Sequence, residues 1–334
     1  MKSNIGRPKR WILSLPARGI NIRAFCPMVI LLSLAVWQLP AQEGDYEWWN
    51  QMHNWDGVTH WSDYIIPSPY YMGPNALPVP YSEKGKVRSD ASFGLGYRYH
   101  FSASDPTQNL YAGLYVPLFG QRAALGIWGA PVERYNMDAS TVMERRTRNR
   151  DGKGNASGDI HIDCIYQILR NKSFPDLALR ISLRTASGNS LGDARYTDAP
   201  GYSFDLSAGK EIPMDSKGDK KICIHAMAGF YAWQMNLKNN RQNDAFLFGT
   251  GADFHWGKFS LENSLAGYLG YLGDEEATVV KQEPVAFRDR PVVFRTQISH
   301  RMKKINAMIG YQAGLHDWQY HTLKITLEYR FSFR

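Results

Sequence analysis

The last thirteen residues of the chain, 322–334, alternate strictly between polar and apolar side chains. The apolar positions run from Leu323 to Phe333 and include three aromatic residues, whereas hydroxyl or charged residues occupy the positions between them. Successive side chains of a β-strand point to opposite faces of the sheet. A strand in the wall of a transmembrane barrel meets lipid on one face and the lumen on the other. The C-terminus therefore predicts a wall strand of such a barrel.

The same alternation recurs through most of the chain and predicts an all-β protein. We expect a transmembrane antiparallel β-barrel of about twelve strands, an even number as in bacterial barrels. A soluble all-β sandwich is the alternative fold. The phase of the seventh segment is ambiguous. The predicted strands cover residues 92–101, 110–118, 122–132, 159–168, 177–184, 202–209, 220–236, 245–255, 261–269, 292–298, 304–314 and 322–334.

The lengths of the links between these segments also favour a membrane barrel, which has short periplasmic turns and longer outer loops. We expect short turns at 119–121, 170–176, 213–219, 256–257 and 301–303. The intervening links are mostly longer, at 133–157, 186–200, 237–244 and 272–290, and 315–320 is the short exception. A soluble sandwich has no reason to alternate link lengths. This order predicts that both ends of the barrel lie in the periplasm.

The chain divides into a targeting segment, an extension and the barrel. Residues 1–41 contain six basic residues and no acid, then an apolar run at 28–36 and a small residue, Ala41. These features are typical of a secretory signal peptide, although the run also allows an uncleaved anchor. The barrel is expected to cover residues 89–334. The residues after position 41 include 33 basic and 31 acidic side chains. This near balance of charge argues against a nucleic-acid partner.

Residues 42–88 form the extension, which is rich in Trp and Pro and shows neither strand nor helix periodicity. It is expected to lie in the periplasm or to insert into the lumen. His53, Asp56, His60 and Asp63 are spaced so that a helix would place them on one face, and their types suit a zinc-like ion. A polar face without metal is the simpler interpretation, because Gly57 to Thr59 disfavour a helix. We predict no cofactor.

Charged side chains on the inner face are the candidate functional residues. They either line a wet pore that selects solutes by charge and size, or pair with one another in a filled interior. An open lumen with the extension outside it favours the pore, and a closed, fully salt-bridged lumen favours the filled barrel. The candidates for lumen selectivity are Arg98, Arg180, Arg184, Arg295, Asp159, His161, Asp163 and Glu262.

Two catalytic interpretations receive little support from the sequence. His161 lies between Asp159 and Asp163 on one predicted face, which suits acid–base chemistry, but no nucleophile accompanies them. A lipid hydrolase needs Ser and His together on the outer wall. His100 precedes Ser102 at a suitable spacing but is predicted to face inward, and Ser299 and His300 are predicted to face opposite sides. We therefore predict that the protein is not an enzyme.

Several short motifs carry a resemblance to a known family. Residues 158–162 read GDIHI, 175–180 read PDLALR, and Ser187-Gly188 follows. This pattern resembles the outer-membrane barrels grouped as the meta-pathway phenol-degradation family, with Ala186 where that family tends to have Pro. The Trp-rich extension and the GPNALP stretch at 73–78 look like outer-membrane proteins of Bacteroidetes-type bacteria. The resemblance implies a transporter or channel and suggests hydrophobic compounds as its solutes, and it identifies no binding residue.

We therefore expect a channel or transporter for passive passage of a small solute through the bacterial outer membrane. Its expected partners are outer-membrane lipid, lipopolysaccharide and the solute. A lipid-modifying enzyme and a filled structural or surface-interaction barrel are the alternatives.

Overall fold

The computed structural model describes residues 45–170, 173–236, 241–271, 276–277, 285–286 and 288–332. The chain divides into two units, Met1–Gln42 and Glu43–Arg334. The first unit, which contains the predicted signal peptide, lies outside the described residues. Among the described helices, none has the length and apolar character needed to span a bilayer.

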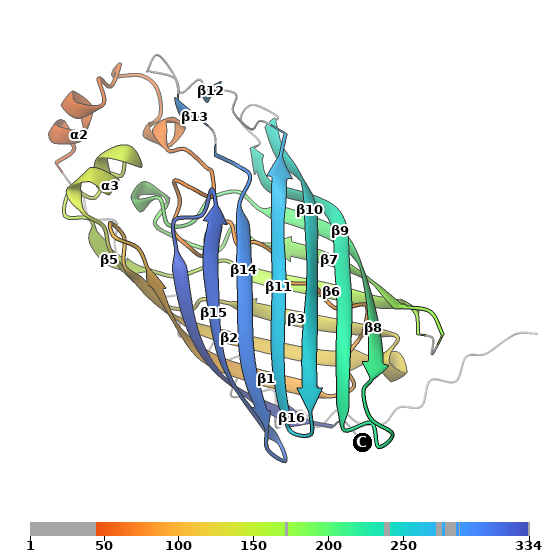
Figure 1. Cartoon of the computed structure of the whole chain (residues 1–334). Coiled ribbons are helices and arrows are strands. Elements are labelled where there is room, and N and C mark those ends of the chain that lie inside the picture. The colour runs from red at the N-terminus through yellow and green to blue at the C-terminus, as the bar shows by residue number, and fades with distance from the viewer. Residues whose placement is uncertain are drawn as a thin grey trace, which may run out of the picture. The chain divides into compact units, whose positions relative to one another are not determined.

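Twelve strands of the second unit close into one antiparallel barrel, which confirms the predicted fold (Figure 1). Each strand pairs with its neighbours along the chain, and β1 closes the barrel by pairing with both β2 and β16. Every predicted segment corresponds to one of these strands. They are β1 (Ala91–Phe101), β2 (Thr107–Leu118), β3 (Ala123–Gly129), β6 (Ile160–Leu169), β7 (Asp176–Arg184), β8 (Gly201–Pro213), β9 (Lys220–Asn236), β10 (Arg241–Trp256), β11 (Phe259–Gly270), β14 (Val292–Arg301), β15 (Ile305–His316) and β16 (His321–Phe331).

Shorter elements lie in the extension and in the links. The extension contains α2 (Glu47–Met52) and the 3₁₀ turn η2 (Trp61–Tyr64). The long link between β3 and β6 holds β4 (Glu133–Asn136), α3 (Ala139–Glu144) and β5 (Lys153–Ala156), and β4 prolongs the wall by pairing with β2. The remaining elements are η3 (Phe119–Gln121), η4 (Leu191–Asp193), β12 (Glu276–Ala277) and β13 (Val285–Ala286).

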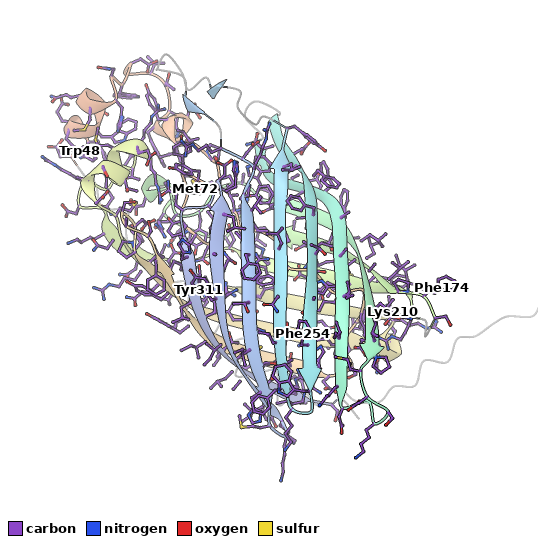
Figure 2. All side chains as sticks on the ribbon, in the orientation of Figure 1. Trp48, Met72, Phe174, Lys210, Phe254 and Tyr311 are labelled. Atoms are coloured by element: carbon purple, nitrogen blue, oxygen red, sulfur yellow. The ribbon has the colours of Figure 1, made fainter. Side chains whose placement is uncertain are left out.

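The wall turns its apolar side chains outward, as the alternation predicts. Phe254 and Tyr311 lie on the outer surface, each 39% exposed (Figure 2). On β6, Tyr166 is exposed whereas its neighbour Ile165 is buried inside. The phase of β9, which the sequence left ambiguous, places Cys223, His225, Met227, Tyr231 and Trp233 inward.

One polar residue breaks the apolar outer face of β11, and a neighbouring strand compensates for it. Asn263 lies opposite Thr296 of β14 in the strand register. The hydroxyl of Thr296 donates a hydrogen bond of 2.9 Å to the side-chain oxygen of Asn263. A polar group facing lipid is destabilising unless it is hydrogen-bonded, so this pair makes the position tolerable.

The links at one end of the barrel are uniformly short, whereas those at the other end vary more than the sequence indicated. The short-turn end has the links after β2, β6, β8, β10 and β14, together with the start of β1 and the end of β16. At the long-link end, the predicted 237–244 loop is wrong, because β9 and β10 continue until Asn236 pairs with Arg241. The intervening residues 237–240 lie outside the described part.

The extension runs along the inner side of the wall from the long-link end to the start of β1. Near the long-link end, the indole of Trp49 donates to the carbonyl of Arg146, which follows α3 (2.9 Å). Near the short-turn end, the amide of Val87 donates to the side chain of Gln167 on β6 (2.8 Å). Between these points the segment contacts inward-facing side chains of many strands. The Tyr268 hydroxyl donates to the Leu77 carbonyl, and the amide of Gly85 donates to the Ser207 hydroxyl.

An apolar core joins the extension to the inner wall in the half of the barrel nearer the long links. From the extension come Trp49, Tyr64, Ile65, Ile66, Tyr71, Met72, Ala76, Leu77 and Val79. The wall and its links contribute Ala194, Met227, Tyr231, Trp233, Ala245, Leu247, Ala266, Tyr268, Val293, Trp318 and Tyr320. Burial of this much apolar surface holds residues 49–79, the upper part of the extension, against the wall.

Candidate functional site

The inner wall and the extension that contacts it form the candidate site. All eight residues predicted to face the lumen lie on the inner side of the wall or of its links. Asp159, His161, Asp163, Arg180, Arg184 and Arg295 are buried there, Arg98 is partly buried, and Glu262 contacts the extension. Their roles in solute selection stay a prediction.

Arg180 and Arg184, on one face of β7, are paired with carboxylates. Arg180 donates to Asp205 of the neighbouring strand β8 at 2.9 Å and to Glu83 of the extension at 3.0 Å. Arg184 donates to Asp159 at 2.7 Å. Because these groups are almost fully enclosed, each pair compensates for the desolvation of its own charges. These two arginines therefore present no free positive charge to a solute.

Glu262 also pairs with the extension, and no periodic pattern in the sequence indicated its partner. Lys84 lies 2.7 Å from Glu262 on β11 and 2.8 Å from Asp253 on β10. His225 of β9 lies 3.6 Å from the other oxygen of Asp253. One lysine of the extension thus holds two carboxylates of the wall.

The structure separates the three residues that suggested acid–base chemistry. Asp159 accepts hydrogen bonds from Arg184 and from the amide of Gly188. Asp163 accepts from the indole of Trp128 and from Ser182. The imidazole of His161 stacks on the Trp128 ring at 3.7 Å. These hydrogen bonds of the two carboxylates go to groups other than His161, and the arrangement is a packed polar wall.

Three cations surround a cavity in the middle of the lumen. Arg98, Arg295 and Lys324 line it, together with Tyr81 of the extension. Its volume is about 40 Å³. Arg295 donates to the carbonyls of Val79 and Pro80 at 2.6 and 3.1 Å. Lys324 donates to the hydroxyl of Tyr81.

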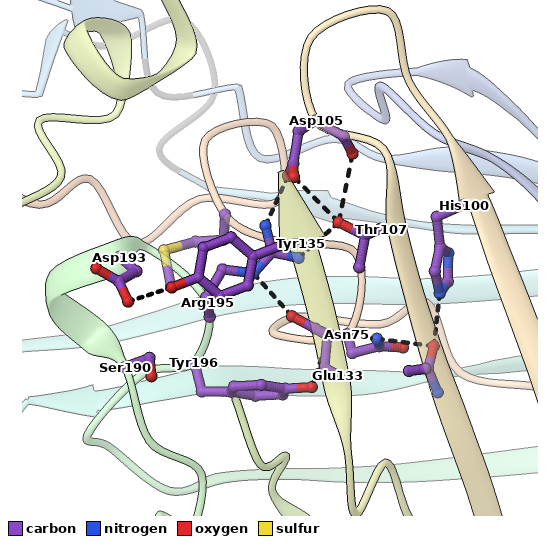
Figure 3. A network of polar contacts seen from close by, with 12 residues as sticks. Asn75, His100, Asp105, Thr107, Glu133, Tyr135, Ser190, Asp193, Arg195 and Tyr196 are labelled. Atoms are coloured by element: carbon purple, nitrogen blue, oxygen red, sulfur yellow. Dashed lines mark hydrogen bonds and ion pairs between the residues drawn. The ribbon is translucent and has the colours of Figure 1, made fainter. Parts of the chain in front are cut away.

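A second polar network lies near the long-link end, and the sequence reasoning missed it (Figure 3). Asp105 accepts hydrogen bonds from Arg195 at 2.6 Å, Arg145 at 2.8 Å and Tyr320 at 2.5 Å. Glu133 accepts from Arg195 at 2.7 Å. Burial acts to raise the pKa of Asp105, but the two guanidinium charges outweigh it and hold this pKa below its usual value.

Asn75 links this network to the extension. Its side-chain amide donates to Glu133 at 2.5 Å and to Asn109 at 3.1 Å, and Asn109 in turn contacts His100 (Figure 3). Arg145 and Arg195 lie in links, where no strand alternation indicates which way a side chain points. The only sequence signal was the presence of charged residues in links otherwise rich in turn residues.

The four candidate metal ligands do not share a helix, which removes the geometric basis of that hypothesis. Helix α2 ends at Met52, and His53 follows it as the capping residue. The Asp56 carboxylate accepts from the amides of Val58 and Thr59, and His60 caps η2, which contains Asp63. Within the described ranges, no group of three potential ligands is arranged to hold a metal ion. Burial, with a smaller contribution from Arg146, lowers the pKa of His53 to about 4.

The Ser and His pairs weighed for lipid hydrolysis do not form a catalytic pair on the outer wall. His100 is buried inside and contacts Thr322 at 2.9 Å. Ser299 bonds to Ser260, whereas His300 stacks on Phe259, so β14 turns the two residues to opposite faces. His60 contacts Ser62 at 2.7 Å, but this contact belongs to the cap of η2 in the extension.

Comparisons with known proteins support the fold. No family model and no curated protein matches the chain. An outer-membrane channel from Pseudomonas putida F1 is similar in structure, with a TM-score of 0.52 and 11% identity, covering 76% of this chain and 100% of that one. A KdgM porin in complex with disordered oligogalacturonate gives a TM-score of 0.42 at 11% identity, covering 72% of this chain and 99% of the porin. At 11% identity, the similarity to the Pseudomonas putida channel shows the β-barrel fold alone.

Proposed function

We propose that the protein is an outer-membrane channel for passive passage of a small solute, and that residues 67–88 close its lumen. In this proposal the short-turn end and both ends of the barrel lie in the periplasm. The long links lie outside the cell, so the extension begins there and returns through the lumen. Membrane lipid and lipopolysaccharide surround the apolar outer face.

The observation that carries the proposal is the contact between the extension and the inner wall. Lys84 pairs with β10 and β11, Glu83 with β7, and Arg88 with Glu328 of β16. The cavity beside Tyr81, of about 40 Å³, holds only a few waters. A solute larger than this requires displacement of the extension.

Polar groups hold residues 81–88, the lower part of the extension, against the wall. This supports a lumen that opens when these contacts are released. Residues 81–88 contact the wall through ion pairs, hydrogen bonds and one buried apolar side chain, Val87, whereas the upper part contributes many residues to the larger apolar core. Polar contacts exchange with water more readily than a buried apolar core, which has no alternative partners in water. We therefore propose that the lower part moves first.

The resemblance to the meta-pathway phenol-degradation family suggests a hydrophobic solute. The inward faces of β9, β10 and β11 support this finer proposal, because Met227, Tyr231, Trp233, Leu247 and Tyr268 all lie there. Displacement of the upper extension would uncover this aromatic and aliphatic surface. The related suggestion of a Bacteroidetes-type outer-membrane protein rests on the sequence of the extension alone.

A filled structural barrel is the second candidate, and the apolar core favours it. Trp49, Tyr64, Ile66, Met72 and Leu77 of the extension are each no more than 1% exposed. A core packed to this degree resists displacement. A closed and salt-bridged interior is also the arrangement that the sequence reasoning assigned to a filled barrel.

Conductance of the full refolded chain in a planar bilayer distinguishes the two candidates. The Glu83→Gln/Lys84→Met variant removes ion pairs between the extension and β7, β10 and β11. The proposed channel shows more frequent conductance steps in this variant than in the wild type. The Lys86→Met variant is the matched control, because the pair of Lys86 with Glu211 lies at an exposed site. Silence of a correctly folded Glu83→Gln/Lys84→Met barrel would favour the filled barrel.

A further inference from the structure

Three inward-facing cations at one level of the lumen are not balanced by carboxylates. Arg98 of β1 and Lys324 of β16 are direct partners in the strand register. Arg295 of β14 lines the same cavity. Among the described residues, no salt bridge joins any of these three to a carboxylate, unlike Arg180, Arg184 and Lys84. Like charges directly opposite each other in a sheet are destabilising.

Neutral groups satisfy these cations only in part. Arg295 is hydrogen-bonded to two carbonyls of the extension and to Gln312. Lys324 is 9% exposed and donates a hydrogen bond to the Tyr81 hydroxyl. The guanidinium of Arg98 lies over the Tyr111 ring at 4.3 Å, and its buried Nε has no hydrogen-bond partner among the described residues. A buried unsatisfied donor commonly marks a position for a bound water or ion.

One carboxylate, that of Asp159, also lines this cavity, but it already has a partner. Asp159 pairs with Arg184 at 2.7 Å, which neutralises it locally. The remaining polar lining consists of neutral side chains and two histidines, His100 and His161. Among the described residues, the three cations of the lining therefore have no unpaired carboxylate beside them, and a buried cation needs a paired anion to offset its desolvation.

We propose that Arg98, Arg295 and Lys324 form a binding site for a small carboxylate anion. A carboxylate in the cavity accepts hydrogen bonds from Arg98 and Lys324, because a planar oxygen pair matches a guanidinium and accepts from an ammonium group. In doing so it takes the place of the Tyr81 hydroxyl on Lys324. The volume of about 40 Å³, room for a few waters, suits a first ligand of the size of formate or acetate.

The position of Tyr81 gives the site access and couples it to the extension. Its side chain is 42% exposed, so water reaches the cavity from the lumen. Its ring lies beneath Arg295 at 3.9 Å, and its hydroxyl contacts Lys324. When an incoming carboxylate replaces the Tyr81 hydroxyl on Lys324, the wall loses one contact with this part of the extension.

Thermal unfolding of the full refolded chain in detergent tests the site, with sodium acetate as the probe. The reference is sodium gluconate at the same ionic strength, because gluconate is too bulky for the cavity. Binding to the folded state alone raises the unfolding temperature as the ligand concentration increases. We expect a saturable rise with acetate that exceeds the rise with gluconate. Equal curves for the two salts would overturn the proposal.

Substitutions at the cations give a second, opposite readout. Lys324→Met removes one uncompensated charge, so the unfolding temperature without acetate is expected to rise and the response to acetate to disappear. Lys324→Arg keeps the charge and keeps the response. Arg180→Met removes a paired cation from the same wall, so it is expected to lower the unfolding temperature and keep the response. Loss of the response in Arg180→Met as well, or its persistence in Lys324→Met, would contradict the assignment.

The site does not depend on conduction, so the two proposals fail separately. An acetate response in a barrel that never conducts leaves the anion site in place and removes the channel. A barrel that conducts but shows no acetate response leaves the channel in place and removes the anion site.

Discussion

The Nζ of Lys84 lies 2.8 Å from a carboxylate oxygen of Asp253. Lys84 belongs to the extension, which no periodic pattern described, and Asp253 belongs to β10, whose inward phase the sequence predicted. Asp253 is enclosed in the wall, so the charge that neutralises it comes from the inserted segment. This relationship ties the stability of the wall to the position of the extension.

Replacement of Lys84 is therefore expected to destabilise the barrel. Lys84→Met leaves Asp253 and Glu262 close together without their shared cation. Loss of one partner from a largely enclosed ion pair costs about 1–3 kcal/mol after allowance for the partial exposure of the lysine. Urea unfolding of the refolded barrel measures the difference. Lys86→Met, which breaks an exposed pair, is expected to change stability by less than about 1 kcal/mol. Equal effects of the two variants would contradict this role of Lys84.

A close approach of two backbones makes Gly209 sensitive to a single methyl group. A Cβ at Gly209 would lie 2.0 Å from the carbonyl oxygen of Lys84, which cannot move without shifting the extension. Gly209→Ala is expected to displace residues 82–87 and to increase their cleavage by an added protease. Gly94→Ala is the matched control on β1, because its nearest atoms lie 3.9 Å away. Unchanged proteolysis in Gly209→Ala would show that the extension does not lie against β8.

The network around Asp105 is expected to be among the most sensitive polar positions. Asp105 and Glu133 together balance Arg145 and Arg195, and all four side chains are fully enclosed. Asp105→Asn leaves two buried guanidinium groups short of a counter-charge, and loss of a buried partner costs about 3–5 kcal/mol. Asp138→Asn supplies the control, since asparagine caps a helix about as well as aspartate. Denaturant titration of both variants checks the contrast, and a small effect at Asp105 would be inconsistent with the network.

The pH dependence of the upper extension is expected to follow His53. Its pKa falls from an ordinary 6.5 to about 4 in the folded protein, mainly through burial. A histidine with a lowered pKa contributes its full stability above the unfolded value, and that stability declines as the pH falls from 6.5 towards 4. Hydrogen exchange of residues 45–66 should therefore accelerate over this interval. His53→Phe should remove the acceleration, and an identical pH profile in this variant would rule out His53 as its source.

The sequence predicted the wall well because a single physical rule governs it. Strands between lipid and lumen must alternate, so the inward phase of Arg98, Asp163 and Arg295 followed from their neighbours. The rule fails where residues face neither lipid nor water. The inward face of β9 is itself apolar, since Met227 and Trp233 pack on the extension, and its phase was therefore ambiguous.

The contacts of the candidate site could not be predicted in the same way. Lys84 and Glu83 lie in a segment without periodicity, so nothing indicated that they would neutralise Asp253, Glu262 and Arg180. Arg145 and Arg195 reach Asp105 from separate links, and link conformations depend on tertiary contacts. The sequence thus identified which wall residues face inward, but their partners depend on the path of the extension.

The most direct test of the proposed closure is conductance before and after release of a bond between the extension and the wall. The side chains of Lys84 and Glu262 meet at 2.7 Å, so cysteines at both positions lie within reach of a short bifunctional thiol reagent whose spacer contains a disulfide. The background carries serine in place of Cys26, Cys164 and Cys223. We predict a silent barrel when the bond is formed and conductance steps after a reductant is added to the same bilayer. Silence in both states would contradict the channel, and steady conductance in both would contradict closure by the extension.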